Sequence, residues 1–255
     1  MSTYAELQDR VAVVIGSSRG IGLETAKRLA NNGASVGIVA RGGDAVDQAV
    51  ASIQAAGGRA VGVVADATSL EAIEHVRDRI ESEFGAVDFV AAFAGSGSAR
   101  PGPVYELSED DWRSTVDGNL TATFLTLKTF LPGMVERHAG AIVTMASSAG
   151  RTPTPAAPVP YAAAKAGIVM LTRHVASQVG QYGVRVNCLS PSTVLTERTR
   201  AQMPDEVKQR FTALHPLGRL GEPKDVAEAA CFLASDSASW LTGVVVDVAG
   251  GAVMV

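Results

Sequence analysis

Cysteine is scarce in this sequence. Cys188 and Cys231 are the only two in 255 residues, and their spacing fits neither a metal site nor a disulfide framework. Stabilisation by several disulfides and metal binding by cysteine thiolates are therefore excluded as organising features. The cysteine usage fits a reducing compartment, so we expect a cytoplasmic protein.

Long hydrophobic runs and a strong excess of one charge are also missing. No apolar run reaches the length that crossing a membrane requires, and residues 1–9 lack the basic-then-apolar pattern of a signal peptide. The net charge of −4 gives no reason to expect nucleic acid or an anionic membrane as a partner. With 47% hydrophobic and 19% charged residues, the chain has the composition of a globular protein that can fill a core.

Seven short apolar segments alternate with longer segments of helical periodicity. The apolar segments are nearly continuous, as expected for strands covered on both faces, and comprise Val11–Ile15, Ser35–Ala40, Ala60–Val64, Val87–Phe93, Ala141–Met145, Arg185–Leu189 and Val244–Val248. The helical segments are Gly22–Asn32, Gly43–Gly57, Ser69–Phe84, Ser108–Arg137, Tyr161–Gly180 and Pro223–Ala234. The pattern predicts the α/β class, with a doubly wound, Rossmann-type sheet of seven parallel strands and helices on both faces. A (β/α)8 barrel is the alternative, but it needs an eighth unit.

The chain shows no linker or repeat, so we expect one nucleotide-binding domain over residues 1–255. Two stretches interrupt the alternation. Thr152–Pro160 contains four prolines and predicts an extended loop before the helix that starts at Tyr161. Ser190–Leu220 is long for a connection, so we expect it to fold over a ligand site as a lid.

A glycine-rich turn, Gly16-x3-Gly20-x-Gly22, follows the first strand and enters a helix. Glycines at such a turn let the backbone approach a pyrophosphate, and the helix N-terminus favours its negative charge. A turn without a ligand is the alternative, but its place after the first strand favours a dinucleotide site.

The end of the second strand bears on which dinucleotide binds. Ala40 offers no carboxylate for the ribose hydroxyl of NAD, whereas Arg41 offers a planar cation suited to the 2′-phosphate of NADP. Arg19, inside the glycine turn, is placed to approach the same phosphate. Asp66, after the third strand, is either an acceptor for the adenine amine or a simple turn residue. The pattern favours NADP(H) over NAD(H).

A tyrosine and a lysine stand four residues apart in Tyr161-Ala-Ala-Ala-Lys165, a spacing that places both on one helix face. A nearby ammonium favours the phenolate and is expected to lower the tyrosine pKa. Such a pair can give a proton to a carbonyl oxygen or take one from an alcohol. A half-buried tyrosine beside a solvated lysine is the alternative for a spacing this short.

Taken in order, the motifs resemble those of the short-chain dehydrogenase/reductase superfamily, and in particular its 3-oxoacyl-[acyl-carrier-protein] reductases. They cover nearly the whole chain and comprise Gly16-x3-Gly20-x-Gly22, Asp66, Ala94-Gly95, Asn119, Ser147, Tyr161-x3-Lys165, Pro191 through Thr196 and Asp247-x2-Gly250-Gly251. The resemblance implies that Tyr161 is the acid/base and that Lys165 binds the nicotinamide ribose and lowers the tyrosine pKa. It also implies that Ser147 binds the reacting oxygen and that Asn119 positions the lysine. The implied cofactor contacts are Gly16, Ser18, Arg19, Gly20, Ile21, Gly22, Arg41, Asp66, Ala67, Ala94, Gly95, Tyr161, Lys165, Pro191, Val194 and Thr196.

Some of these assignments carry alternatives. Ser147 fits the family's Ser-x2-Gly pattern, whereas counting back thirteen residues from Tyr161 selects Ser148, and an extra residue in the proline-rich loop favours Ser147. Asn119 lies inside a predicted helix, where asparagine is a poor helix former, and indicates either a local irregularity or a solvent-facing position.

The chain also departs from the family pattern at three places. Ile15 replaces the usual threonine before the first glycine, Ala92-Phe93 replaces an asparagine pair, and Ser192 replaces the glycine after Pro191. We expect these changes to affect stability and the floor of the cofactor pocket rather than to remove a catalytic group.

The expected function is therefore NADP(H)-dependent, reversible hydride transfer between nicotinamide and a secondary alcohol or ketone. A hydrophobic ketone or 3-oxoacyl thioester suits the apolar lid, while steroids and sugars remain open, and His215 is expected to be an exposed loop residue. A nucleotide-binding regulatory or assembly protein without activity is the alternative. The resemblance implies a homotetramer or homodimer, with no metal, nucleic acid or membrane partner.

Overall fold

The computed structural model describes residues 4–95, 99–154 and 156–254. Seven parallel strands form one sheet in the order β3-β2-β1-β4-β5-β6-β7. The strands are β1 (Val11–Ile15), β2 (Ser35–Ala40), β3 (Arg59–Val64), β4 (Phe89–Ala92), β5 (Gly140–Met145), β6 (Val184–Pro191) and β7 (Val245–Val248). The predicted doubly wound parallel sheet is confirmed.

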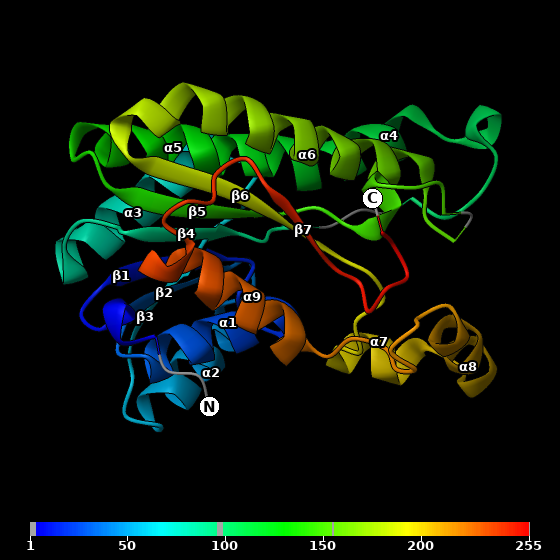
Figure 1. Cartoon of the computed structure of the whole chain (residues 1–255), viewed down its shortest axis with the longest axis horizontal. Coiled ribbons are helices and arrows are strands. Elements are labelled where there is room, and N and C mark those ends of the chain that lie inside the picture. The colour runs from blue at the N-terminus through cyan, green and yellow to red at the C-terminus, as the bar shows by residue number, and fades with distance from the viewer. Residues whose placement is uncertain (1–3, 96–98, 155, 255) are drawn as a thin grey trace.

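Helices cover both faces of the sheet (Figure 1). One face carries α1 (Gly20–Asn31), α2 (Gly43–Gln54) and α9 (Pro223–Ala234), and the other carries α3 (Leu70–Phe84), α5 (Ala122–Glu136) and α6 (Val159–Val179). Each face has its own apolar core, because the strands β1 to β6 are hydrophobic on both sides and their residues alternate between the two cores. Within the described ranges, no helix is both long and apolar enough to span a bilayer.

The order of the strands positions a site. The chain turns from β1 outward to β3 on one side and from β4 outward to β7 on the other, so β1 and β4 are neighbours. The connections that leave these two strands therefore diverge at their carboxyl ends. In open α/β sheets such a reversal of strand order leaves a crevice, and the predicted glycine turn lies at its edge.

The predicted helix over Ser108–Arg137 is wrong as a single regular helix. It consists of α4 (Glu109–Val116), a π-helical segment at Asp117–Thr121, and α5. The predicted N-cap is confirmed, since the Ser108 hydroxyl accepts a hydrogen bond from the amide of Asp111. Ser69 caps α3 in the same way through the amide of Ala72.

Several other boundaries differ from expectation by a few residues, and two differences bear on the site. Helix α6 begins at Val159 rather than Tyr161, with Pro160 in its first turn, where a missing N–H removes no helical hydrogen bond. The connection over Ser190–Leu220 contains two unpredicted helices, α7 (Glu197–Gln202) and α8 (Asp205–Ala213), which lie beside the body of the sheet (Figure 1).

Candidate active site

Three cavities that share lining residues form one continuous cleft at the carboxyl edge of the sheet. The largest, about 570 Å³, we call the reaction cavity, and it is lined by Ser147, Tyr161 and Lys165 among others. A cavity of about 360 Å³ lies beside Arg41 and Asp66, and one of about 200 Å³ lies against the glycine turn. Every residue predicted for catalysis or cofactor binding lines at least one of the three.

The glycine turn has the close backbone packing that its sequence indicates. Gly16 adopts a φ of +87°, a left-handed conformation that favours glycine. A β-carbon on Gly22 would lie 2.2 Å from the carbonyl oxygen of Gly16, so only glycine lets helix α1 begin this close to the end of β1. The turn and the first helical turn line the 200 Å³ cavity together with Thr196. The residues present thus fit a dinucleotide phosphate.

The other end of the cleft contains charges of both signs. Arg19 and Arg41 are exposed and line the 360 Å³ cavity with Asp66. The amide and hydroxyl of Thr68 donate to Asp66 Oδ1 at 2.9 and 2.8 Å, and these bonds, with the charge of Arg41, lower the pKa of Asp66. Asp66 is therefore a turn residue that also presents an ionised carboxylate to the cavity.

Lys165 is buried beneath the reaction cavity, with 3% of its surface exposed. Its Nζ donates to the carbonyl oxygen of Met145, the last residue of β5, at 2.8 Å. Burial lowers the pKa of Lys165 to about 8. The nearby Cys188 opposes this decrease. The alternative of a solvated lysine is therefore wrong.

Tyr161 lies one helical turn before Lys165, whose Nζ is 5.5 Å from the centre of the phenol ring. Burial raises the pKa of Tyr161, and a hydrogen bond with Ser147 opposes the increase. The expected lowering by the ammonium is thus wrong for the chain as it stands, because removal of the phenol from water disfavours the phenolate. The contact with Ser147 supports the choice of Ser147 over Ser148.

Asn119 lies in the π-helical segment and is fully buried, so the local irregularity was the right alternative and solvent exposure the wrong one. Its Nδ2 donates to the carbonyl oxygen of Thr115 at 2.8 Å. A β-carbon built on Gly95 would lie 3.1 Å from Asn119 Oδ1 and 3.7 Å from Lys165 Nζ. Gly95 therefore lets the amide and the ammonium approach the same point from two different helices.

Comparison with known proteins agrees with this geometry. A family model described as Enoyl-(Acyl carrier protein) reductase matches residues 15–253. The chain is 37% identical to (2S)-[(R)-hydroxy(phenyl)methyl]succinyl-CoA dehydrogenase subunit BbsD of Thauera aromatica, over 96% of this chain and 97% of that protein. It is 40% identical to cis-4-hydroxycyclohexanecarboxylate dehydrogenase of Sinomonas cyclohexanicum, over 95% and 96%. A crystal structure of a 3-oxoacyl-[acyl-carrier protein] reductase with bound NAD from Brucella melitensis superimposes with a TM-score of 0.91 at 35% identity, covering 98% of this chain and 94% of that one.

The chain belongs to the short-chain dehydrogenase/reductase superfamily. Its predicted membership and its expected oxidoreductase activity are thereby confirmed.

Two departures from the superfamily pattern have visible consequences. Phe93 lines all three cavities, so the floor of the cleft has an aromatic ring where the family pattern has an amide. The Ser192 hydroxyl lies 3.0 Å from Nε2 of His215, whose Nδ1 lies 2.7 Å from the carbonyl oxygen of Phe211. His215 is 4% exposed, so the expectation of an exposed loop histidine is wrong. It joins the end of α8 to the segment after β6.

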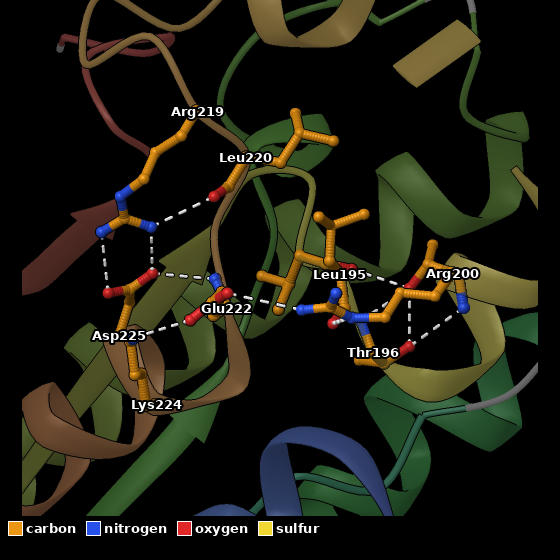
Figure 2. Close-up of polar contacts among 10 residues, drawn as sticks. Leu195, Thr196, Arg200, Arg219, Leu220, Glu222, Lys224 and Asp225 are labelled. Atoms are coloured by element: carbon orange, nitrogen blue, oxygen red, sulfur yellow. Dashed lines mark hydrogen bonds and ion pairs between the residues drawn. The ribbon is translucent and has the colours of Figure 1, made fainter. Parts of the chain in front are cut away.

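The segment that contains α7 is joined to α9 by charged groups (Figure 2). Arg200 on α7 reaches Glu222, which Lys224 also contacts, and Arg219 forms a two-point ion pair with Asp225. These partly exposed pairs are individually weak, and the Arg200–Glu222 pair is the one among them that links α7 to the start of α9.

Two residues of this dehydrogenase site were missed by the sequence reading. Thr115 is 2% exposed and lines the reaction cavity, and its Oγ1 has no hydrogen-bond partner among the residues that the structure describes. Its spacing of four from Asn119 is the signal that would have placed it on the same helix face. Arg198 lines both the reaction cavity and the 200 Å³ cavity, and no motif indicates it.

A separate cavity of about 500 Å³ lies at the amino ends of the strands, near Arg10 and Trp240. None of the predicted site residues lines it. Ligands of doubly wound sheets bind at the carboxyl edge, so the cleft described above is the candidate site.

Proposed function

We propose that this protein catalyses reversible, NADP(H)-dependent hydride transfer between nicotinamide and the carbon of a secondary alcohol or ketone. The observation that carries the proposal is the meeting of Ser147, Tyr161 and the buried Lys165 on one cavity that continues to the glycine turn. The chain works as one domain, with residues 190–220 as the substrate lid.

The glycine turn, Asp66, the Ala94–Gly95 turn and Pro191 to Thr196 would hold the dinucleotide, with Lys165 at its nicotinamide ribose. When bound, the nicotinamide supplies or accepts the hydride. The chain's own residues supply the proton chemistry. A carbonyl oxygen between the hydroxyls of Ser147 and Tyr161 accepts two hydrogen bonds that strengthen as negative charge develops on it.

Tyr161 is the proton donor in the direction of reduction. The phenol is protonated at neutral pH and so holds the proton to be donated, while the pKa that burial raises makes it a weaker acid in the chain alone. The charge of Lys165 stabilises the phenolate that remains, and Asn119 keeps the lysine in place from the far side of Gly95. The same groups run in reverse for oxidation of an alcohol.

The test of this mechanism is Tyr161→Phe, assayed at the nicotinamide absorbance with a panel of ketones and alcohols. Turnover should fall by at least about a thousandfold, since the proton donor is lost, while NADPH binding measured by fluorescence stays within about threefold. Tyr182→Phe, the same substitution at a tyrosine that lines none of the three cavities of the cleft, serves as the control. Unaltered turnover in Tyr161→Phe would refute the assignment.

The preference for NADP(H) rests on Ala40 and Arg41 at the end of β2, which both line the 360 Å³ cavity. Arg41→Ala should weaken NADPH binding by roughly 10- to 100-fold, as expected for loss of a charge-assisted phosphate contact, and change NADH binding by less than about threefold. Arg79→Ala, on the exposed side of α3, is the matched control. A wild-type enzyme that binds NADH more tightly than NADPH would overturn the preference.

The substrate we propose is a hydrophobic carbonyl compound or a 3-oxoacyl thioester. The walls of the reaction cavity support this, since Ala156, Ala157 and Phe211 provide apolar surface. The names of the similar proteins point the same way, since they describe hydroxyacyl-CoA, hydroxycarboxylate and 3-oxoacyl substrates. We further propose a cytoplasmic homotetramer or homodimer.

A nucleotide-binding regulatory or assembly protein without activity is the competing proposal. A protein of that kind would need the fold and the glycine turn to bind a nucleotide. It would not need the paired hydroxyls of Ser147 and Tyr161 next to a buried lysine. A wild-type protein that binds NADPH but turns over no member of the panel would favour it.

A further inference from the structure

The charges on the wall of the reaction cavity are all of one sign. Among its described lining residues, only Lys165 and Arg198 are charged, and no aspartate or glutamate lines it. Its remaining polar side chains are neutral hydroxyls and the amide of Asn119. A cleft lined by one sign of charge favours a substrate of the opposite sign.

The two cations are not equally available. Lys165 is buried, bonds to the carbonyl oxygen of Met145, and is assigned to the cofactor and to Tyr161. Arg198 is exposed, and its one described hydrogen bond joins Nε to Gln202 Oε1 at 3.3 Å. Within the described part of the chain Arg198 takes part in no ion pair, although Glu197 lies beside it in sequence and lines the smaller cavity.

The orientation of α7 explains why Arg198 faces the cavity. Arg200 on the same helix is turned toward α9, where it meets Glu222 (Figure 2). Two residues along an α-helix correspond to a rotation of about 200°, so a side chain at position 198 points to nearly the opposite side. Thr196 and Thr199 form a capping box at the start of α7, in which each side chain bonds to the backbone of the other residue. These bonds stabilise the first turn of the helix.

We propose that Arg198 binds a carboxylate carried by the substrate, so that the enzyme prefers oxo acids, or the matching hydroxy acids, to their neutral analogues. This proposal rests on the proposed function and specifies its substrate class. A guanidinium presents paired N–H donors that match the two oxygens of a carboxylate. Because Arg198 and Tyr161 line the same cavity of about 570 Å³, the carboxylate and the reacting carbonyl belong to one compact molecule.

The test uses pairs of oxo acids and their methyl esters at several chain lengths: 4-oxopentanoate, 5-oxohexanoate and 6-oxoheptanoate. Wild-type enzyme should reduce at least one acid with a kcat/KM roughly 10- to 100-fold above that of its ester. Arg198 also lines the 200 Å³ cavity beside the glycine turn, so all assays use saturating NADPH. Under these conditions Arg198→Met should remove the preference by lowering kcat/KM for the acid at least tenfold more than for its ester. Arg198→Lys should restore part of the preference.

Lys208→Met is the matched control, because Lys208 is an exposed cation on α8 that lines none of the three cavities of the cleft. It lowers the charge of the same lid without altering the cavity, so it should keep the preference for acids. Equal losses on acid and ester in Arg198→Met, or a wild type that reduces the esters as well as or better than the matching acids, would overturn the proposal.

A binding measurement separates this proposal from the proposed function. Calorimetry of Tyr161→Phe loaded with NADPH reports binding of the same oxo acids without turnover. Binding that is lost in the Tyr161→Phe, Arg198→Met double variant supports the role of Arg198 even if the wild type reduces none of these acids. Binding unchanged by the second substitution contradicts it.

A second experiment tests whether Arg198 binds a carboxylate of the substrate or a phosphate of a CoA group attached to the substrate. Acetoacetyl-CoA and the acetoacetyl thioester of N-acetylcysteamine share the reacting group, but only the former carries phosphates. If Arg198→Met impairs only the CoA thioester and spares the oxo acids, Arg198 recognises the carrier and the carboxylate assignment is wrong.

Discussion

Lys165 carries its charge where charge is disfavoured. Its ammonium is buried and has a protein carbonyl as a hydrogen-bond partner, that of Met145. With its pKa lowered to about 8, the group is mostly charged at neutral pH but close to losing its proton. A small rise in pH therefore changes the electrostatics beside Tyr161 in a way that an ordinary lysine would not allow.

We predict that NADPH binding weakens as pH rises above about 8, the pKa of Lys165 in the free protein. The direction follows from the charge: below this pH the ammonium attracts the anionic cofactor, and above it the neutral amine does not. The loss should approach tenfold by about pH 9.5, measured by nicotinamide fluorescence. Lys165→Met should bind NADPH more weakly at pH 7, and its affinity should not fall further in a step near pH 8. Lys208→Met should keep this pH-dependent step. A step that survives in Lys165→Met belongs to another group.

Sequence motifs placed the predicted catalytic residues together but did not give their environment. The spacing of Tyr161 and Lys165 and the order of the other motifs placed all predicted residues on one cleft. The direction of the Tyr161 pKa was wrong because it depends on how much water the folded chain excludes, which no spacing encodes. The burial of His215 was missed for the same reason, since the fold brings it against residues far away in the sequence, such as Ser192, 23 residues earlier.

At the scale of elements, prediction succeeded where apolar periodicity is strong. All seven strands were found because each is a short hydrophobic run between turn signals. The helices α7 and α8 were missed because no residue in either is buried, so neither has an apolar face to detect. The definition of α7 comes from its capping box and from a charged partner, Glu222, at the start of α9.

The π-helical segment illustrates a partly predictable feature. A buried asparagine inside a helical pattern signalled an irregularity at Asn119, but not which kind. Single π-helical turns inside longer helices are often found at functional sites. Here the irregular segment carries Asn119, whose Oδ1 lies beside Gly95 at the point that Lys165 Nζ also approaches.

For the whole molecule, the single chain leaves large apolar side chains exposed on the face that carries α4, α5 and α6. Trp112, Phe124 and Met170 are each at least 40% exposed, and Tyr105 is 84% exposed. Helices α5 and α6 lie along the same face of the sheet (Figure 1). Several large exposed apolar side chains on the helices of one face are typical of a face that another subunit covers.

We therefore predict that the protein is an oligomer whose subunits pair through α5 and α6, with a mass in light scattering of two or four times the 26.3 kDa chain. In a two-fold interface the α5–α6 face of one subunit packs on the α5–α6 face of the other. Phe124→Glu therefore introduces one carboxylate from each subunit into an apolar interface. That variant should lower the mass at least by half and keep the circular dichroism of the wild type. Leu214→Glu, at an exposed leucine after α8, should leave the mass unchanged. A wild-type protein that elutes as a monomer at micromolar concentration contradicts the prediction.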